Sequence, residues 1–405
     1  MSFVSHLEAA IDGTRLPHDA LQTLHGGRPL WVRYDRAAVE AAMSKEVVAA
    51  REPTMWRYRE LLPVSDETKI ASLGEGMSPL LRCERLGAEL GLDDLWVKDE
   101  SQLPTGSFKS RGLSVAISRA AELGVRRVAI PTAGNAGGAM AAYAARAGME
   151  AFVFMPVDTP IVNQYEAAYY GARAFLVDGL ITDCGAVVRE GAARMGWFDL
   201  STLREPYRIE GKKTMGLELA EQLAWTLPDV IMYPTGGGTG LIGMWKSFDE
   251  LEALGWLRDG RKPRMMSCQA AGCAPISMAW REGKRFADPF PHPATCASGL
   301  RVPAAVGDFM ILDAVNESGG QARSCSEEAL VRWARRGAEL EGIAFAPEAG
   351  ACLGVLESLV AEGVVDPRER VVVFNTGAAQ KYVEVIGDSP LPRLPYPVDW
   401  EALAG

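Results

Sequence analysis

Short runs of apolar and β-branched residues alternate along this chain with longer stretches of helical periodicity. Several of the short runs are apolar almost throughout, as expected of strands that are buried on both faces. The runs that read as strands are 95–98, 127–130, 151–155, 173–177, 230–233, 265–269 and 371–374. Helical patterns lie between them, among them 137–147, 241–254 and 327–341. This alternation predicts an α/β fold with mostly parallel sheets and crossover helices.

The first 70 residues show a weaker pattern, which we interpret as short helices and loops with a possible strand at 30–33. No repeat or low-complexity segment is visible. In parallel α/β folds, ligands bind at the carboxyl ends of the strands. The turns that follow the predicted strands are therefore the segments in which to look for chemistry.

Composition narrows the class of protein. The 405 residues are 48% hydrophobic and 23% charged, which is ordinary for a globular protein, and the formal net charge is −10. This balance argues against nucleic acid and anionic membranes as partners and leaves a small-molecule substrate. No stretch approaches 18 unbroken apolar residues, and the first residues lack a secretory pattern. The seven cysteines form no CxxC pair, so we expect reduced thiols, no zinc and a cytoplasmic protein.

Lys109 carries the strongest chemical signal. It follows a proline–glycine turn at 104–106 and directly precedes a helical stretch at 113–123. At the start of a helix the macrodipole disfavours a positive charge, and a lysine held in that way can form a Schiff base. A solvated surface lysine is the alternative interpretation. Two further turns downstream favour the interpretation of Lys109 as a Schiff-base lysine.

The second turn, 130–138, follows a strand and opens a helix rich in alanine. Its small residues leave backbone N–H groups free at the helix N-terminus, which suits a carboxylate. Asn135 can both donate and accept hydrogen bonds toward a ring hydroxyl. A helix cap with close packing would account for the same residues.

The third turn joins the strand at 230–233 to a helix and holds four glycines and a threonine hydroxyl. Such a nest of N–H donors is typical of a phosphate cradle. The cradle residues are Gly236, Gly237, Gly238, Thr239 and Gly240. Residues 238–243 also match GxGxxG, but a dinucleotide site wants an acid after the next strand, where Gln269 stands instead. A nicotinamide site is therefore the weaker interpretation.

The fourth segment with candidate chemistry is the strand at 371–374, which is followed by Asn375-Thr376-Gly377. The hydroxyl of Thr376 could meet a ring nitrogen, or Thr376 could simply be the residue at which the strand ends. The four histidines show no metal or triad spacing, and no GxSxG elbow is present.

Taken in order, these segments resemble the pyridoxal phosphate enzymes of fold type II, and within them the threonine synthases. The resemblance runs from about residue 55 to 385. The motifs that carry it are 55–63, 74–80, 98–100 with 104–109, the Asn135 loop, the glycine loop and 375–377.

The resemblance implies the roles of the site residues. Lys109 would hold the cofactor as a Schiff base and then shuttle the proton, while Asn135 would meet the 3′-hydroxyl and Thr376 the pyridine nitrogen. Phe108 and the amides of the glycine loop would complete the cofactor site. The substrate would meet Ser107, Thr132, Ala133 and Gly134, and its phosphate would meet Arg208, with Lys212 and Lys213 as further candidates.

The resemblance also implies a fold and a reaction. Such enzymes have two domains, each a mostly parallel sheet flanked by helices. Here they would be an N-terminal segment and part of the large domain at 1–102, a small domain at 103–212 and the remaining large domain at 213–405. The similar enzymes convert O-phospho-L-homoserine and water to L-threonine and phosphate, and a homodimer is expected from the family alone.

Three departures leave alternatives open. Ser110 stands where many relatives have an aspartate, and the glycine loop lacks the asparagines of many threonine synthases and is closer to that of the amino-acid dehydratases. The stretch 7–35 lacks the cysteines of a zinc-ribbon-like segment. The first alternative is therefore an ammonia-lyase or β-replacement enzyme of the same fold. A second is a non-catalytic small-molecule binder, against which intact Lys109, Asn135 and Thr376 argue.

Overall fold

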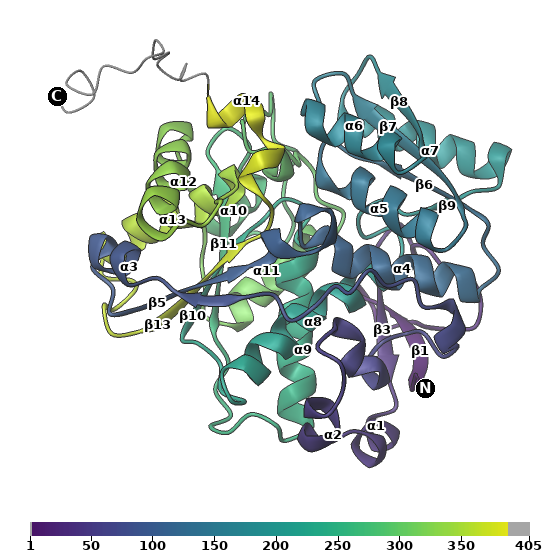
Figure 1. Ribbon diagram of the computed structural model, residues 1–405, viewed down its shortest axis with the longest axis horizontal. Helices are drawn as coiled ribbons and strands as arrows, with labels where there is room; N and C mark the ends of the chain where they lie inside the picture. Colours follow the sequence, from purple (N-terminus) through teal and green to yellow (C-terminus); the bar gives the residue numbers. More distant parts are fainter. Residues whose placement is uncertain (1, 388–405) are drawn as a thin grey trace, which may run out of the picture.

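The predicted strands fall into two separate sheets, shown in the computed structural model, which describes residues 2–387 (Figure 1). The larger sheet has six strands and is parallel except for its edge strand β4, which runs antiparallel to β5. In spatial order the strands are β12 (Ala322–Cys325), β11 (Arg264–Ala270), β10 (Val230–Pro234), β13 (Arg370–Asn375), β5 (Asp94–Asp99) and β4 (Leu80–Arg82).

The smaller sheet has four parallel strands. Their order is β8 (Arg173–Val177), β7 (Glu150–Pro156), β6 (Arg127–Pro131) and β9 (Phe198–Asp199). All seven strands predicted from the pattern are present, and the predicted α/β class is confirmed. The two-residue β9 and the short β4 and β12 were not predicted, because runs of two to four residues carry too little periodicity.

Alternation along the central strands divides the core of the large sheet between its two faces. In β10, Val230 and Met232 belong to one apolar cluster, while Ile231 and Tyr233 belong to the other. The first face is covered by α3 (Glu84–Leu90), α12 (Glu327–Glu341) and α13 (Pro347–Ala361). The second is covered by α8 (Tyr207–Gln222), α9 (Thr239–Ala253), α10 (Pro275–Arg281) and α11 (Asp308–Glu317). Both faces of this sheet are thus buried, which explains its continuous apolar strands.

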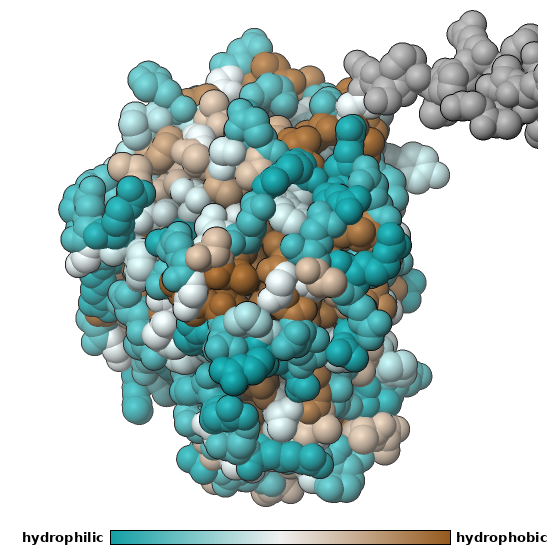
Figure 2. All heavy atoms as spheres, turned by 90° about the vertical axis from the view of Figure 1, so that its left-hand side faces the viewer, coloured by the Kyte–Doolittle hydropathy of each residue, from teal (hydrophilic) through white to brown (hydrophobic). Residues whose placement is uncertain are grey.

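Helices α3 and α12 have polar residues on the side that faces away from the sheet. Leu330, Trp333 and Leu340 of α12 point into the core, whereas Arg336 pairs with Glu89 on α3 at the surface. That face of the molecule is largely hydrophilic around a smaller hydrophobic area (Figure 2).

The small sheet is also covered on both faces. One face packs against α4 (Lys109–Glu122), α5 (Asn135–Arg146) and α6 (Ile161–Tyr169), and the other against α7 (Ile181–Met195). The four strands lie within the predicted range 103–212, but the domain boundaries themselves remain a prediction. Helix α8 contacts both α4 and α9 and so joins the two halves of the molecule.

The N-terminal region differs from the expectation of short helices and loops. Strands β1 (Val4–Ala9), β2 (Arg15–Leu16) and β3 (Leu30–Tyr34) form an antiparallel sheet of their own, of which only β3 was anticipated. Leu7, Leu30 and Val32 join the same apolar cluster as α4 and α5. These strands depend on packing against distant helices, which a local pattern does not reveal. Helices α1 (Arg36–Ala42) and α2 (Lys45–Ala49) follow.

Within residues 2–387, no helix is long and apolar enough to cross a membrane.

Candidate active site

A cavity of about 370 Å³ lies between the two sheets and collects the turns singled out in the sequence. It is lined by the loops that follow β6, β10 and β13, together with the start of α4. Every predicted site residue except Ser107 and the further candidates Lys212 and Lys213 lines it: Phe108, Lys109, Thr132, Ala133, Gly134, Asn135, Arg208, Gly236, Gly237, Gly238, Thr239, Gly240 and Thr376. Parallel strands bring these loops together because their carboxyl ends share one edge of each sheet.

Lys109 is the first residue of α4, as its sequence position predicted. Its Nζ lies 4.0 Å from the centre of the Phe108 ring, and Phe108 N–H donates to the carbonyl of Thr376 at 3.1 Å. Burial and the nearby Arg208 guanidinium lower the pKa of Lys109 to about 7, against an opposing effect of Glu348. Near neutral pH this amine is therefore uncharged to a far greater extent than that of an ordinary lysine, and the uncharged form is the one that attacks a carbonyl.

The Asn135 loop opens α5, with Gly134 as the residue before the helix. Thr132 Oγ1 accepts the Gly134 N–H at 3.1 Å and so fixes the turn. Asn135 Nδ2 donates to the Tyr382 hydroxyl at 3.2 Å, whereas Asn135 Oδ1 is buried and has no protein partner. The first N–H groups of a helix have no intrahelical acceptor, so this loop offers donors for a carboxylate.

A side chain would clash with neighbouring protein atoms at each glycine of the loop 236–240. A Cβ on Gly236 would lie 2.3 Å from the Gly299 carbonyl oxygen, and one on Gly237 would lie 2.7 Å from Thr202 Cγ2. Gly238 has a φ of +74° and directly precedes α9. The cradle at a helix N-terminus and the unpartnered Asn135 Oδ1 both fit the phosphate and ring hydroxyl of pyridoxal phosphate.

Gly238→Asp should weaken binding of pyridoxal phosphate at least about tenfold. The new Cβ would lie 2.3 Å from Ile311 Cδ1 at a positive φ, and the carboxylate would repel the cofactor's phosphate. Gly238→Ala separates the two effects, because it introduces the same strain without the charge. Fluorescence titration of the apoprotein with cofactor gives the dissociation constants, and unchanged affinity in the Asp variant would mean that the cradle is misplaced.

The structure explains why the GxGxxG match does not make a dinucleotide site. Gln269, near the end of β11, donates to the Thr235 carbonyl at 3.0 Å and accepts the Ser277 N–H at 2.9 Å. Both ends of its side chain are engaged within the protein. No acid stands there to bind a ribose.

Of the three basic residues proposed for a substrate phosphate, only Arg208 lines the cavity. Its Nη1 donates to the Leu200 carbonyl at 2.8 Å, and its Nε is buried without a partner. Lys212 lies beneath the Phe108 ring and donates to the Phe108 carbonyl. Lys213 pairs with Glu210 at 2.7 Å and Glu250 at 3.0 Å. Ser107 is buried behind the wall of the cavity, so its role toward substrate remains a prediction.

Several residues that line the cavity escaped the sequence analysis. They are Arg189, Arg204, Arg301, Glu348 and Tyr382. Glu348 left one signal, because it is an acid at the second position of the otherwise apolar stretch 347–356, which forms most of α13. The arginines lie in segments with no motif, and only the fold brings them to the cavity.

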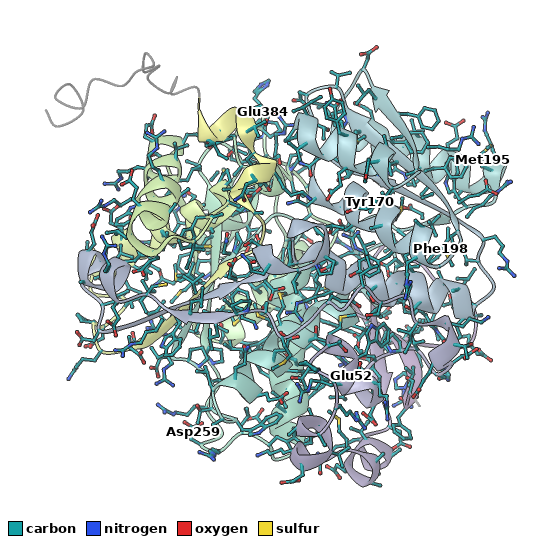
Figure 3. The ribbon with its side chains drawn as sticks, viewed as in Figure 1. Glu52, Tyr170, Met195, Phe198, Asp259 and Glu384 are labelled. Carbon is teal, nitrogen blue, oxygen red and sulfur yellow. The ribbon has the colours of Figure 1, made fainter. Side chains whose placement is uncertain are left out.

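Polar contacts from two segments, one at Arg301 and one at 381–384, join the two halves of the molecule beside the cavity. Arg301 pairs with Asp158 at 2.8 Å, and Lys381 pairs with Glu166 at 2.7 Å. Glu384 on α14 (Val383–Ile386) accepts the Ile161 N–H at 3.0 Å, and Figure 3 shows it at the boundary between the halves. The small sheet is thus tied to the large one at the mouth of the site.

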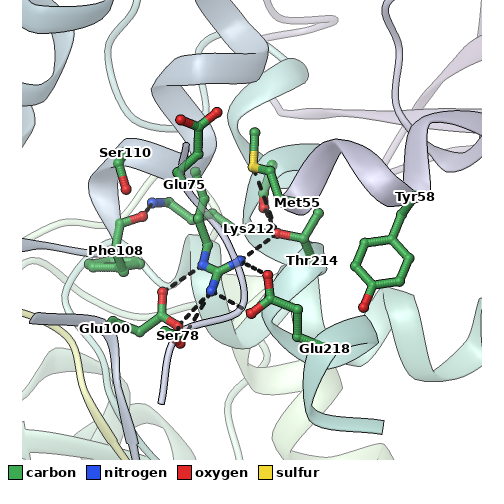
Figure 4. Close-up of polar contacts among 12 residues, drawn as sticks. Met55, Tyr58, Glu75, Ser78, Glu100, Phe108, Ser110, Lys212, Thr214 and Glu218 are labelled. Atoms are coloured by element: carbon green, nitrogen blue, oxygen red, sulfur yellow. Dashed lines mark hydrogen bonds and ion pairs between the residues drawn. The ribbon is translucent and has the colours of Figure 1, made fainter. Parts of the chain in front are cut away.

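A buried ion cluster around Arg111 lies next to the Lys109 turn in the chain, and Figure 4 shows its contacts with Glu100 and Glu218. Arg111, two residues along α4, is fully buried and donates to Glu100 at 2.6 Å and to Glu218 at 2.7 Å. Lys98 pairs with the same Glu218 at 3.2 Å. The two cations lower the pKa of Glu218 to about 2 despite the opposing effect of burial. The cluster joins α4, α8 and the end of β5.

Among residues 2–387, the cysteines and other possible metal ligands form neither a disulfide nor a metal site. All seven cysteines are free, and six of them are buried. Within residues 2–387, no group of three or more His, Cys, Asp or Glu side chains is placed to hold a metal ion.

Comparison with known proteins agrees with this geometry. Residues 71–377 match the family model described as "Pyridoxal-phosphate dependent enzyme". The chain is 36% identical to the threonine synthase of Methanocaldococcus jannaschii, over 90% of this chain and 89% of that one. It is 35% identical to that of Methanosarcina acetivorans, over 88% and 87%. It is 32% identical to that of Mycobacterium tuberculosis, over 84% and 92%.

Solved structures with the same fold include diaminopropionate ammonia lyase from Escherichia coli, with a TM-score of 0.67 and 18% identity over 79% of this chain and 92% of that one. Maize serine racemase has a TM-score of 0.64 and 21% identity over 75% and 88%. At these identities the likeness concerns the fold alone. The family match and the sequence relatives together establish that this chain belongs to the pyridoxal-phosphate-dependent enzymes and, among them, to the threonine synthase family.

Proposed function

We propose that this enzyme converts O-phospho-L-homoserine and water to L-threonine and phosphate, with Lys109 as the catalytic base. The observation that carries the proposal is the meeting of three groups in one cavity. These are the Lys109 amine, the helix N-terminus at Asn135 and the Arg208 guanidinium. They match the α proton, the carboxylate and the phosphate of such a substrate.

Lys109 would take the proton from the substrate's α carbon onto its Nζ. The pKa of about 7 supports this role, because a base works best when its pKa is near the working pH. The nearby Phe108–Thr376 contact restrains the start of α4, and so the direction in which the amine points. When bound, pyridoxal phosphate delocalises the negative charge that develops at the α carbon.

The two anionic ends of the substrate would be held from opposite walls. The backbone N–H groups of the Thr132–Asn135 loop would take the carboxylate, and Arg208 would take the phosphate. Arg208 is almost fully buried at 1% exposure, so an ion pair with phosphate would be little screened by water. Arg204 adds positive charge to the same cavity, whereas the charge of Arg301 is matched by Asp158.

An ammonia-lyase of the same fold remains the second candidate, because the loop Gly236–Gly240 is free of asparagine. Such an enzyme would release ammonia and a 2-oxo acid from L-threonine or L-serine, without phosphate. The deciding assay supplies cofactor-loaded protein with O-phospho-L-homoserine and measures phosphate and threonine together. Equal amounts of both support the proposal. No phosphate from O-phospho-L-homoserine, together with ammonia and a 2-oxo acid formed from L-threonine or L-serine in a parallel reaction, would favour the second candidate.

Arg208→Gln should raise the KM for O-phospho-L-homoserine by about 10- to 100-fold. This range follows from the loss of one hydrogen-bonded charge pair, about 1.5–3 kcal/mol. Binding of L-threonine, which has no phosphate, is the internal control and should change much less. Steady-state kinetics and threonine-induced changes in cofactor absorbance give the two values, and an equal loss in both would make Arg208 a structural residue only.

We also propose that the enzyme is a homodimer in the cytoplasm, as expected from the family. Light scattering after gel filtration tests the dimer, and a mass equal to one chain would contradict it.

A further inference from the structure

A chain of hydrogen bonds crosses the cavity wall and ends on Asn135. Glu348 Oε1 accepts the Gly299 N–H at 2.8 Å and also the Tyr382 hydroxyl at 2.8 Å. The Tyr382 oxygen in turn accepts a hydrogen from Asn135 Nδ2 at 3.2 Å. Glu348 and Tyr382 are 4% and 2% exposed, and neither was anticipated from the sequence.

The direction of this chain is fixed at its buried end. A backbone N–H is always a donor, so Glu348 Oε1 accepts at Gly299; burial raises the pKa of Glu348, and a proton on this carboxyl would take the unpartnered Oε2. Burial, and then the neighbouring Glu348, raise the pKa of Tyr382 well above its usual range, so the phenol keeps its proton. That proton goes to Glu348, and only lone pairs remain on the Tyr382 oxygen to face Asn135.

An amide that meets a lone pair must present its NH₂ group to it. Asn135 Nδ2 is therefore committed to Tyr382, and Asn135 Oδ1 is left free in the cavity wall, buried and without a protein partner. Glu348 Oε2, at the other end of this chain of hydrogen bonds, is also buried without a protein partner.

We propose that Glu348 and Tyr382 are positioning residues that orient the Asn135 amide, so that it offers an acceptor oxygen rather than a donor to the cofactor's ring hydroxyl. The inference rests on the proposed function only in taking Asn135 as the partner of that hydroxyl. An acceptor there stabilises the hydroxyl with its proton in place. A donor would instead stabilise the ionised ring oxygen and move the proton to the nitrogen that links the cofactor to Lys109.

The position of this proton is visible without turnover. Lysine-linked pyridoxal phosphate absorbs at shorter wavelength when the ring hydroxyl keeps the proton, and at longer wavelength when the linking nitrogen has it. The test is therefore the ratio of the two bands in cofactor-loaded protein without substrate, at one fixed pH. The variants are Tyr382→Phe, Glu348→Ala and Glu348→Gln.

Tyr382→Phe removes the acceptor that holds Asn135 Nδ2. Glu348→Ala leaves the Tyr382 proton without its acceptor, so that it turns to Asn135 Oδ1. Both changes free the amide to rotate, and each should raise the ratio of long- to short-wavelength absorbance at least about threefold, the effect of one hydrogen bond. Glu348→Gln is the matched control, because its amide oxygen still accepts from both Gly299 and Tyr382, and its band ratio should match that of the unmodified enzyme.

Only the full pattern supports the proposal: a shift in Tyr382→Phe and Glu348→Ala and none in Glu348→Gln. An unchanged ratio in Tyr382→Phe overturns it, and so does an equal shift in Glu348→Gln, which would point to the charge of Glu348 instead. The band ratio is measured without substrate, so it does not depend on which reaction the enzyme catalyses. A failure of the threonine synthase assay and a failure of this proposal can therefore be told apart. If Glu348→Ala does not fold, the Phe and Gln variants decide the matter.

Discussion

Replacing Lys109 with alanine should abolish turnover, with kcat falling by more than about 1000-fold, and should remove the visible absorbance of lysine-linked cofactor. Alanine can neither hold the cofactor covalently nor accept the α proton, and each of these roles is worth orders of magnitude in rate. The measurement is the phosphate-release assay together with an absorbance spectrum of the purified protein. Retained turnover would contradict the central assignment of the site.

Lys109→Arg is the matched control for the charge. Arginine keeps a cation at the start of α4 but cannot form the link, so it should be as inactive as alanine. The pKa of about 7 gives a further check in the unmodified enzyme. Cofactor incorporation into apoprotein should speed up as the pH rises through about 7, where the amine loses its proton, and then level off. A rate that still climbs steadily toward pH 10 would mean that burial does not lower this pKa.

Arg111→Met should lower the free energy of unfolding by about 3–5 kcal/mol, the usual cost of removing one partner from a buried ion cluster. Arg111 is fully buried, and its loss would leave Glu100 without a counter-charge and Glu218 with Lys98 alone. Urea denaturation followed by tryptophan fluorescence measures the change. A loss below about 1 kcal/mol would show that the carboxylates find other partners or take up protons at little cost.

The surface pair between Arg336 and Glu89 provides the control for this experiment. Both side chains are substantially exposed, so water already screens their attraction. Arg336→Met should therefore change the free energy of unfolding far less than Arg111→Met. Similar losses in the two variants would argue against a special contribution from burial.

The comparison of pattern with structure shows which features were local. Seven of the ten strands in the two parallel sheets were predictable, because residues such as Val230 and Val371 lie in apolar runs bounded by turns. The N-terminal β1 was not, since Leu7 and Ala9 become core only by packing against α4 and α5. The pattern of apolar and polar residues indicates which secondary structure a segment prefers. It does not indicate whether a distant helix or strand will bury that segment.

The basic residues near position 210 illustrate the same limit. Arg208 was the first candidate for a substrate phosphate and Lys212 and Lys213 were further candidates, because charge and motif alone exclude none of the three. Only Arg208 lines the cavity, while the two lysines find partners in the protein interior. Arg208 and Lys212 lie one helical turn apart on the same face of α8, so the residues packed around this helix, and not its periodicity, decide their roles.

The sequence by itself determined the class of fold, the cofactor and the turns that build its site. These features depend on short segments: the apolar periodicity of the strands and helices, the backbone freedom of the glycine loop and the helix start at Lys109. They can therefore be read from the sequence without knowing how the segments pack. The tertiary structure alone decided what surrounds those turns. Glu348, Tyr382 and the Arg111 cluster act through partners about 10 to 250 residues away in the chain, and such contacts exist only once the sheets and helices have packed.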